Sequence, residues 1–332
     1  LMLAAEFRDA TGVQLRAITI DHGLRPEARD EARFAGDVCE TLEIQHDVMS
    51  WERAATGPVS QPVSQEGARR ARHALMADWA WRFGIDRIAL GHTRDDRLET
   101  FLMRARQGSG WYGLAGPMPN SVSPIWRGGR CLLLIRPLLA FGRDELRAEL
   151  LARGAGWVED SSNDATRFER VRMRKLLARM APAARRQALT VMDRLMQLRA
   201  SVAGEALSLF GRLDAVGPTG DMGIALQARE TSGAEAWLRF VEAMVMAAGG
   251  GERGPRRDAL DRLLARIASG DPQLGRGLTL AGARIRVRND AQLCFGRAPP
   301  RRGDPTRRGG DKPDWGRAEA LLAVPDLRVL AV

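Results

Sequence analysis

Short apolar runs alternate with helical patterns in the first half of this chain, and this alternation restricts the fold more than any other feature. Four runs have strand character, at residues 13–20, 44–50, 86–91 and 131–135. Apolar spacing and the usual start and stop signals predict helices over residues 26–42, 65–83, 95–105 and 143–153. Strands that alternate with helices form βαβ units, so the sequence predicts an α/β fold with a parallel sheet.

Residues 91–99 carry the densest group of chemically capable side chains. His92 ends a predicted strand, and Asp96 and Glu99 share one face of the helix that follows. Two carboxylates on one face can bind a cationic substrate or the Mg²⁺ carried by ATP. A histidine beside them can act as a general base near neutral pH. Thr93 and Asp96 also fit a helix capping box, which is a purely structural explanation of Asp96.

Residues 21–23, Asp-His-Gly, form a second polar strand end. Open α/β sheets bind ligands at the carboxyl edge of their strands, so this segment and residues 91–99 are expected at one edge. A plain strand-to-helix turn is the structural alternative for residues 21–23. Downstream, residues 107–116 contain four glycines and predict a loop that allows close backbone approach.

Positive charge points to a polyanionic partner. The formal net charge is +10 over 332 residues, and arginine supplies nearly all of the positive charge because Lys175 and Lys312 are the only lysines. Arginine suits planar, bidentate partners such as phosphate, although a compositional bias explains part of its excess. The commonest polyanionic partner is nucleic acid.

Two helical segments concentrate this charge. Residues 166–186 contain eight basic residues against one acid, Glu169, a density that suits a phosphate backbone. Arg69 and Arg72 share a face of the helix predicted over 65–83 and are candidates for a phosphate clamp. A solvated helical face is the structural alternative in both cases.

The three cysteines, Cys39, Cys131 and Cys294, lie far apart and form no C-x-x-C pair. This pattern argues against a zinc site, an iron–sulfur site or a redox pair and is typical of a reducing cytoplasm. No apolar run approaches the ~20 residues of a membrane-spanning helix. We therefore expect a cytoplasmic protein with no membrane partner.

The second half of the chain changes character. Residues 166–248 are mostly helical in pattern, and a further helix is predicted from Pro255 to about residue 268. Runs at 278–280, 283–287 and 292–295 alternate like a small antiparallel sheet. Residues 296–316 are rich in Arg, Pro and Gly and predict a flexible basic linker, and residues 327–332 suggest a terminal strand.

Several segments together resemble one family, the tRNA(Ile)-lysidine synthetases, which are PP-loop ATP pyrophosphatases. The matching segments are Thr19–Glu27, Glu66–Arg72, Gly91–Thr100, Arg106–Gly110 with Gly113–Gly116, Ile135–Leu139 and Trp157–Asn163, followed by Arg167-Phe168 and the arginines at 170, 172 and 174. They occur in the family's order and spacing over about residues 13–180. Each segment is weak evidence alone, but the ordered set is specific.

The resemblance implies a PP-loop catalytic domain over 1–180, a helical or α+β tRNA-binding domain over 181–295 with the small β element, and a basic linker and tail over 296–332. It implies ATP-dependent joining of free L-lysine to C2 of the wobble cytidine in tRNA(Ile) with a CAU anticodon, through an adenylated tRNA. ATP and Mg²⁺ are the implied cofactors, with no resident metal site. The oligomeric state stays open, with a homodimer among the options.

Site residues follow from the same resemblance. The catalytic candidates are His92, Asp96, Glu99 and Arg69; the ATP-binding candidates are Asp21, His22, Gly23, Gly91 and Arg72; the tRNA-binding candidates are Arg167, Arg170, Arg172, Arg174 and Lys175. Arg136 is a weaker phosphate-binding candidate. The carboxylates would hold the charged end of lysine or Mg²⁺, and the arginines would neutralise phosphates as charge develops.

The chain departs from the family in three places. The family's Ser-Gly-Gly-x-Asp-Ser loop, which cradles ATP phosphates, is absent from the printed sequence and is expected just before Leu1. Residues 1–5 look like the second half of a helix, so we expect a truncated start. Arg94 and Arg97 replace small or amide residues, and Val171 stands where asparagine is common.

Three other functions are weighed against this one. Another PP-loop enzyme, such as a tRNA thiolase, is disfavoured because sulfur transfer usually needs paired thiolates. A catalytically inactive tRNA-binding protein shares every basic feature and differs only in lacking the phosphate loop. A general RNA-binding module explains the charge but not the polar strand ends.

Overall fold

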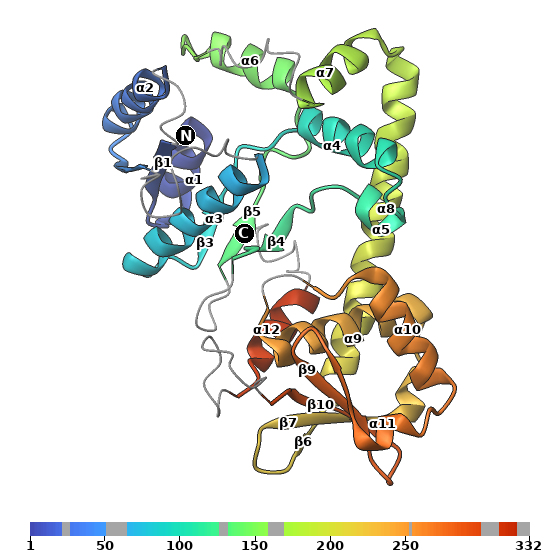
Figure 1. The fold of residues 1–332 in the computed structure, drawn as a ribbon. Coiled ribbons are helices and arrows are strands. Elements are labelled where there is room, and N and C mark those ends of the chain that lie inside the picture. The colour runs from blue at the N-terminus through green and yellow to red at the C-terminus, as the bar shows by residue number, and fades with distance from the viewer. Residues whose placement is uncertain are drawn as a thin grey trace, which may run out of the picture. The chain divides into compact units, whose positions relative to one another are not determined.

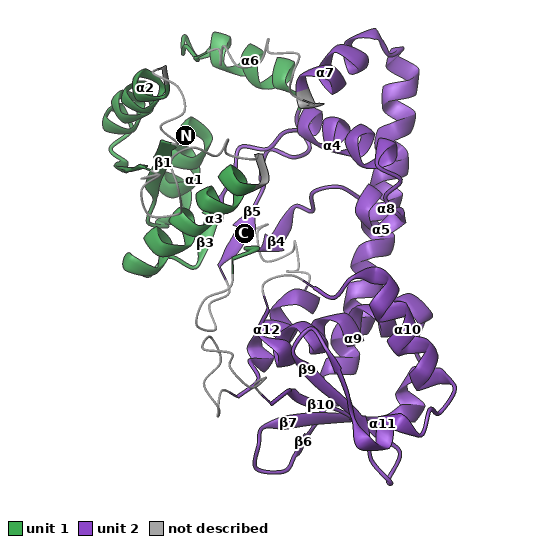
Figure 2. Cartoon of the chain, viewed as in Figure 1, with its two compact units in different colours: residues 1–88, 123–125, 142–165 green, residues 89–122, 126–141, 166–332 purple. Residues whose placement is uncertain are grey.

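The computed structural model describes residues 1–21, 27–50, 65–125, 132–158, 169–251, 254–299 and 312–323. The chain divides into two compact units (Figure 2), the first of residues 1–88, 123–125 and 142–165 and the second of residues 89–122, 126–141 and 166–332. Figure 1 labels the helices and strands of both units. The strands and helices that the sequence predicts over residues 13–153 are present in the predicted order.

The first unit is built on a parallel pair of strands. β1 (Arg16–Asp21) and β2 (Gln45–Ser50) pair in parallel and are connected through α2 (Glu27–Thr41). This β1-α2-β2 segment is the βαβ unit that the sequence predicts, because parallel neighbours need a crossover connection. Its other helices with described positions are α1 (Met2–Thr11), α3 (Gln65–Arg82) and α6 (Arg143–Ala152). A small apolar core joins Ala5, Cys39 and Ile44.

A polar network links α3 to this strand pair. Asp47 of β2 accepts hydrogen bonds from Arg16 Nε at 2.5 Å and from Trp79 Nε1 at 2.9 Å. The Arg16 guanidinium also lies over the Phe83 ring, 3.6 Å from its centroid. These donors hold the pKa of the Asp47 carboxyl below its ordinary value, with the Arg16 hydrogen bond as the largest cause.

A separate sheet of three short strands has the order β3-β5-β4, with β3 at Arg87–Ala89, β4 at Asn120–Val122 and β5 at Leu133–Ile135. β4 and β5 are antiparallel. The sequence predicts β3 and β5 but not β4, whose three residues Asn-Ser-Val carry no apolar alternation. The expected parallel arrangement is therefore confirmed for β1 and β2, while an antiparallel strand is added here.

Three helices of the second unit pack around one apolar cluster. They are α4 (Arg94–Arg106), α7 (Glu169–Arg179) and α8 (Pro182–Phe210). Leu98, Leu177 and Met192, one from each helix, are buried together. Pro182 stands at the first helical position of α8, where a missing N–H costs nothing. The short helix α5 (Trp111–Leu114) follows α4.

The remainder of the second unit is a five-stranded antiparallel sheet in the order β6-β7-β10-β9-β8, covered by helices. The strands are β6 (Asp214–Val216), β7 (Asp221–Ala225), β8 (Leu278–Leu280), β9 (Ala283–Val287) and β10 (Gln292–Arg297). The helices are η3 (Leu226–Arg229), α9 (Ala234–Gly249), α10 (Arg257–Ala268), α11 (Gln273–Arg276) and α12 (Trp315–Leu322).

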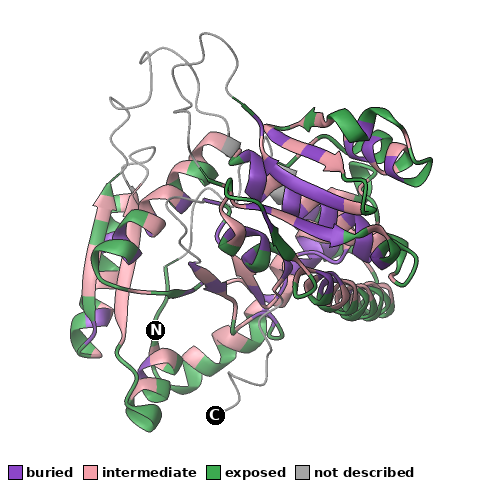
Figure 3. Cartoon of the chain, turned by 90° about the horizontal axis from the view of Figure 1, so that it is seen from below, coloured by how far each residue is buried: buried purple, intermediate pink, exposed green. Residues whose placement is uncertain are grey.

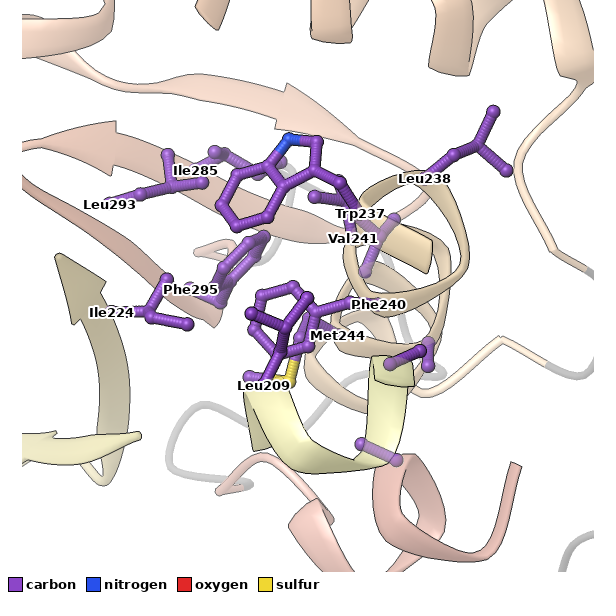
Figure 4. Packing of buried hydrophobic residues seen from close by; sticks show 14 of the residues in the cluster. Leu209, Ile224, Trp237, Leu238, Phe240, Val241, Met244, Ile285, Leu293 and Phe295 are labelled. Carbon is purple, nitrogen blue, oxygen red and sulfur yellow. The ribbon is translucent and has the colours of Figure 1, made fainter. Parts of the chain in front are cut away.

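The main core of the protein lies between α9 and this sheet. Trp237 and Phe240 of α9 pack against Phe295 of β10 and Ile285 of β9 (Figure 4). Phe240 and Phe295 meet edge to face with their centroids 6.0 Å apart. Burial by residue, shown in Figure 3, is most continuous along these strands and α9.

Two elements add to the sequence-based expectations. Residues 166–248 are mostly helical as expected, and β6 and β7 add a hairpin there that pairs with β10. Residues 315–322 were expected in the linker and tail, but α12 is a helix whose Ala318 and Leu322 belong to the main core. The central part of the expected linker and the expected strand over 327–332 lie outside the described residues.

No helix in the described part of the chain is long and apolar enough to cross a membrane. Cys39 and Cys294 are both buried free thiols, and burial raises the pKa of each. Cys131 lies outside the described residues.

Candidate active site

The beginning of α4 holds the first group of candidate residues. Gly91 and His92 follow β3, and Thr93 is the N-cap of α4. The Thr93 N–H donates to Asp96 Oδ2 at 2.9 Å, and its hydroxyl donates to the same oxygen at 2.8 Å. The predicted capping box is therefore confirmed, and it fixes the Asp96 carboxylate at the first turn of the helix.

Glu99 lies one turn further along α4 and is fully buried. Its Oε1 forms an ion pair with Arg174 Nε of α7 at 2.6 Å. The side chain of Glu99 is 1% exposed, whereas that of Arg174 is 30% exposed. A buried carboxylate requires a nearby cation to offset its desolvation, so Arg174 supplies this cation in the structure.

Arg97 lies between Asp96 and Glu99 in sequence but points to a different helix. Its Nη2 pairs with Asp193 Oδ1 of α8 at 2.6 Å and contacts Met196 Sδ at 3.7 Å. This contact explains why the chain can carry an arginine at a position where the family often has a small or amide residue. Arg97 and Glu99 together tie α4 to α8 and α7 by ion pairs on two sides.

Arginines also fix the glycine loop that follows α4. Arg104 donates to the carbonyl of Gly113, Arg136 donates to that of Met118 at 2.9 Å, and Arg199 of α8 donates to that of Gly116 at 3.4 Å. Gly116 has φ +77°, and a Cβ there would meet Met192 Cε at 3.3 Å, so glycine is required for backbone conformation and packing.

Tyr112 of this loop lies between two more cations. The Arg199 guanidinium is 4.4 Å and the Arg239 guanidinium 3.8 Å from its ring centroid. Sequence reasoning missed Tyr112, Arg199 and Arg239, because no local pattern links residues so far apart.

Arg136, a weaker phosphate-binding candidate, also donates to Ser121 Oγ at 3.0 Å.

The other candidates for ATP binding belong to the first unit. Asp21 is the last residue of β1 and is half-buried, and Arg69 and Arg72 are exposed on α3. His22 and Gly23 lie outside the described residues. The expectation that these residues and the beginning of α4 share one sheet edge stays a prediction.

Residues 169–179 of the basic segment form α7, and residues 182–186 are the first residues of α8. Arg172 and Lys175 are exposed on α7, whereas Val171 and Met173 are buried. Val171 therefore packs inward, which accounts for an apolar residue where asparagine is common in the family. Arg167 and the side chain of Arg170 lie outside the described residues. Arg172 and Lys175 are therefore at the surface of the basic helix, and their role at a phosphate backbone stays a prediction.

Among the described residues, no group of three or more His, Cys, Asp or Glu side chains could hold a metal ion. The Glu99 side chain is 1% exposed and paired with Arg174, so it lacks the solvent contact that a hydrated Mg²⁺ needs. Asp96 is half-buried and sits at the helix beginning. An ion carried by nucleotide phosphates fits at Asp96 better than at Glu99.

Comparison with known proteins agrees with the order of these elements. Residues 1–181 match the model of the PP-loop domain. The chain is 41% identical over 300 residues to the tRNA(Ile)-lysidine synthase of Hyphomonas neptunium, covering 89% of this chain and 77% of that protein. It is 34% identical over 324 residues to the tRNA(Ile)-lysidine synthase of a Bradyrhizobium species, covering 91% of this chain and 87% of that protein. The corresponding protein of Ruegeria pomeroyi is 36% identical over 282 residues, covering 82% and 64%.

Proposed function

This chain belongs to the PP-loop family of tRNA(Ile)-lysidine synthases, and we propose that it is a ligase that joins lysine to a tRNA. Its substrate is tRNA(Ile) with a CAU anticodon, and the product carries lysidine at the wobble position. The observation that carries the proposal is the 41% identity to a named lysidine synthase along 89% of the chain.

The reaction has two steps. The C2 oxygen of the wobble cytidine bonds to the α-phosphorus of ATP, and pyrophosphate leaves. An amine of free lysine then bonds to C2, the C2–O bond breaks, and AMP leaves with that oxygen. Adenylation helps because it turns a poor leaving oxygen into a good one. ATP binding follows from the PP-loop domain.

Each candidate residue has a role suited to its surroundings. His92 accepts the proton of the attacking amine, which must be neutral to act as a nucleophile. Glu99 receives the charged end of lysine, because a buried carboxylate suits a single ammonium better than a hydrated Mg²⁺. Asp96, at the helix beginning, is the carboxylate for the Mg²⁺ that accompanies ATP.

The remaining cations neutralise phosphates. Arg69 and Arg72 neutralise the phosphates of ATP. Asp21, residues 22–23 and Gly91 complete the proposed ATP-binding set. The tRNA-binding set is Arg167, Arg170, Arg172, Arg174 and Lys175, of which Arg172 and Lys175 are exposed on α7. In this proposal residues 1–180 form the catalytic domain and 181–295 the tRNA-binding domain, and the enzyme works in the cytoplasm, where its tRNA substrate resides.

The test is incorporation of labelled lysine into a tRNA(Ile) transcript with a CAU anticodon, in the presence of ATP. A transcript with a GAU anticodon, which lacks the wobble cytidine, is the matched control. The printed chain and the same chain preceded by the family's Ser-Gly-Gly-x-Asp-Ser loop are compared. Incorporation specific to CAU supports the proposal. Binding of tRNA without incorporation by either protein would favour the non-catalytic tRNA-binding alternative instead.

A further inference from the structure

We propose that Arg174 sets the affinity for lysine by occupying the carboxylate that lysine must use. This inference rests on the proposed function, in which Glu99 receives the lysine ammonium. The structure shows the Glu99 carboxylate already paired, through Oε1, with Arg174 Nε at 2.6 Å. Lysine therefore binds in exchange for Arg174 and not at a vacant acid.

The exchange follows from the burial of Glu99. Only 1% of its side chain is exposed, so the carboxylate is far from bulk water. One cation offsets the charge of a buried carboxylate, but two cations brought to it repel each other strongly where water does not screen them. An incoming ammonium and the Arg174 guanidinium consequently compete for the same carboxylate.

When lysine displaces Arg174 from Glu99, the guanidinium can move into solvent. Its side chain is 30% exposed, and its neighbours on α7, Arg172 and Lys175, are exposed. A guanidinium released from Glu99 keeps its positive charge on this basic helix, where Glu99 no longer offsets it. Since the helix is proposed to bind RNA phosphates, lysine and tRNA should strengthen the binding of each other, as linkage requires.

The helices can remain packed during this exchange. Leu98, Leu177 and Met192 hold α4, α7 and α8 together by apolar contact. Arg97 is paired with Asp193 on another side of α4, so α4 keeps an ion pair with α8 when Glu99 changes partner. The change is thus local to two side chains, and in this proposal Arg174 sets the affinity for lysine while the apolar contacts keep α4 and α7 packed.

Calorimetric titration of the full chain with L-lysine tests the proposal. Arg174→Gln removes the competing cation, and Arg179→Gln is the matched control because Arg179 is an exposed arginine of the same helix. We expect Arg174→Gln to bind lysine about tenfold more tightly than the wild type, a change within what one charge-assisted hydrogen bond contributes. Arg179→Gln should bind lysine as the wild type does.

Unchanged or weaker lysine binding by a folded Arg174→Gln variant would overturn the exchange. If the wild type still incorporates lysine into tRNA in that case, the proposed function stands and only this inference falls. If neither the printed chain nor the form preceded by the Ser-Gly-Gly-x-Asp-Ser loop binds or incorporates lysine, the proposed function itself falls. Loss of lysine binding in Glu99→Gln would support Glu99 as the shared carboxylate.

A second measurement needs no variant and remains decisive if Arg174→Gln does not fold. Phenylglyoxal modifies accessible arginines, and peptide mass spectrometry reports the extent at each position. Saturating lysine should raise the labelling of Arg174 relative to Arg172 and Arg179 in the wild-type protein. Labelling of Arg174 that stays constant or falls would contradict its release.

Discussion

Replacing Asp193 with asparagine should destabilise the protein more than replacing its partner, Arg97, with methionine. The two side chains form an ion pair at 2.6 Å, but Arg97 is 7% exposed and Asp193 is 55% exposed. Asp193→Asn leaves a guanidinium buried without its counter-charge, at a cost of about 1–3 kcal/mol. Arg97→Met removes the buried charge and leaves Asp193 largely in water, so the expected cost is about 1 kcal/mol or less.

Urea unfolding followed by circular dichroism measures both changes, together with the double variant. In the Arg97→Met background, Asp193→Asn should cost no more than roughly 0.5 kcal/mol, because the charge that it would strand is gone. This result would show that the loss of stability on breaking the ion pair comes from the buried guanidinium of Arg97. Equal costs for the two single variants, or a larger cost for Arg97→Met, would refute the reasoning from burial.

Three other predictions use features far from that pair. Gly249→Ala should destabilise the protein by about 1–3 kcal/mol in the same urea assay, because a Cβ there would lie 2.1 Å from Ala281 O. Gly204→Ala, with nothing within 4 Å of the added Cβ, should instead stabilise the protein by roughly 0.5–1 kcal/mol in that assay. The pKa of the Asp47 carboxyl is lowered in the folded state, so the stability it contributes is present above its ordinary pKa of 3.8 and is lost as the pH falls further. The Asp47→Asn variant should be less stable than the wild type at neutral pH and should lose less stability on acidification. Parallel plots of stability against pH for the two proteins would contradict this role of Asp47. Lys175→Gln should weaken tRNA binding and reduce the slope of log affinity against log salt by about 1, measured by fluorescence anisotropy, and an unchanged slope would remove Lys175 from the interface.

Local patterns predicted the elements whose causes are local. β1 and β2 with α2 between them follow from apolar runs and helical spacing, and the capping box at Thr93 follows from residues three apart. α12 could not be found in this way, because the surrounding sequence is rich in Arg, Gly and Pro. It forms where Ala318 meets the main core and Trp315 Nε1 donates to the carbonyl of Gly220 at 2.8 Å. Trp315 and Gly220 are 95 positions apart in sequence.

In the candidate site, too, the sequence predicts features that depend on local spacing but not pairings between distant residues. Spacing alone places Asp96 and Glu99 within one turn of α4, and the structure agrees. Nothing in the sequence near Glu99 indicates that Arg174, 75 positions later, would be its partner. Such pairings depend on how whole helices pack, and no period of 2 or 3.6 residues records them.

The length of α8 sets the distance between two parts of the second unit. Its 29 residues, at 1.5 Å each, span about 43 Å without an interior proline. Met192, in its first half, packs beside α4, and Leu209, at its end, packs in the core of the five-stranded sheet. A ligand that contacts both ends of this helix must therefore be tens of ångströms long. Inserting one helical turn would move the two ends about 5.4 Å further apart, and only a ligand long enough to contact both ends would be affected.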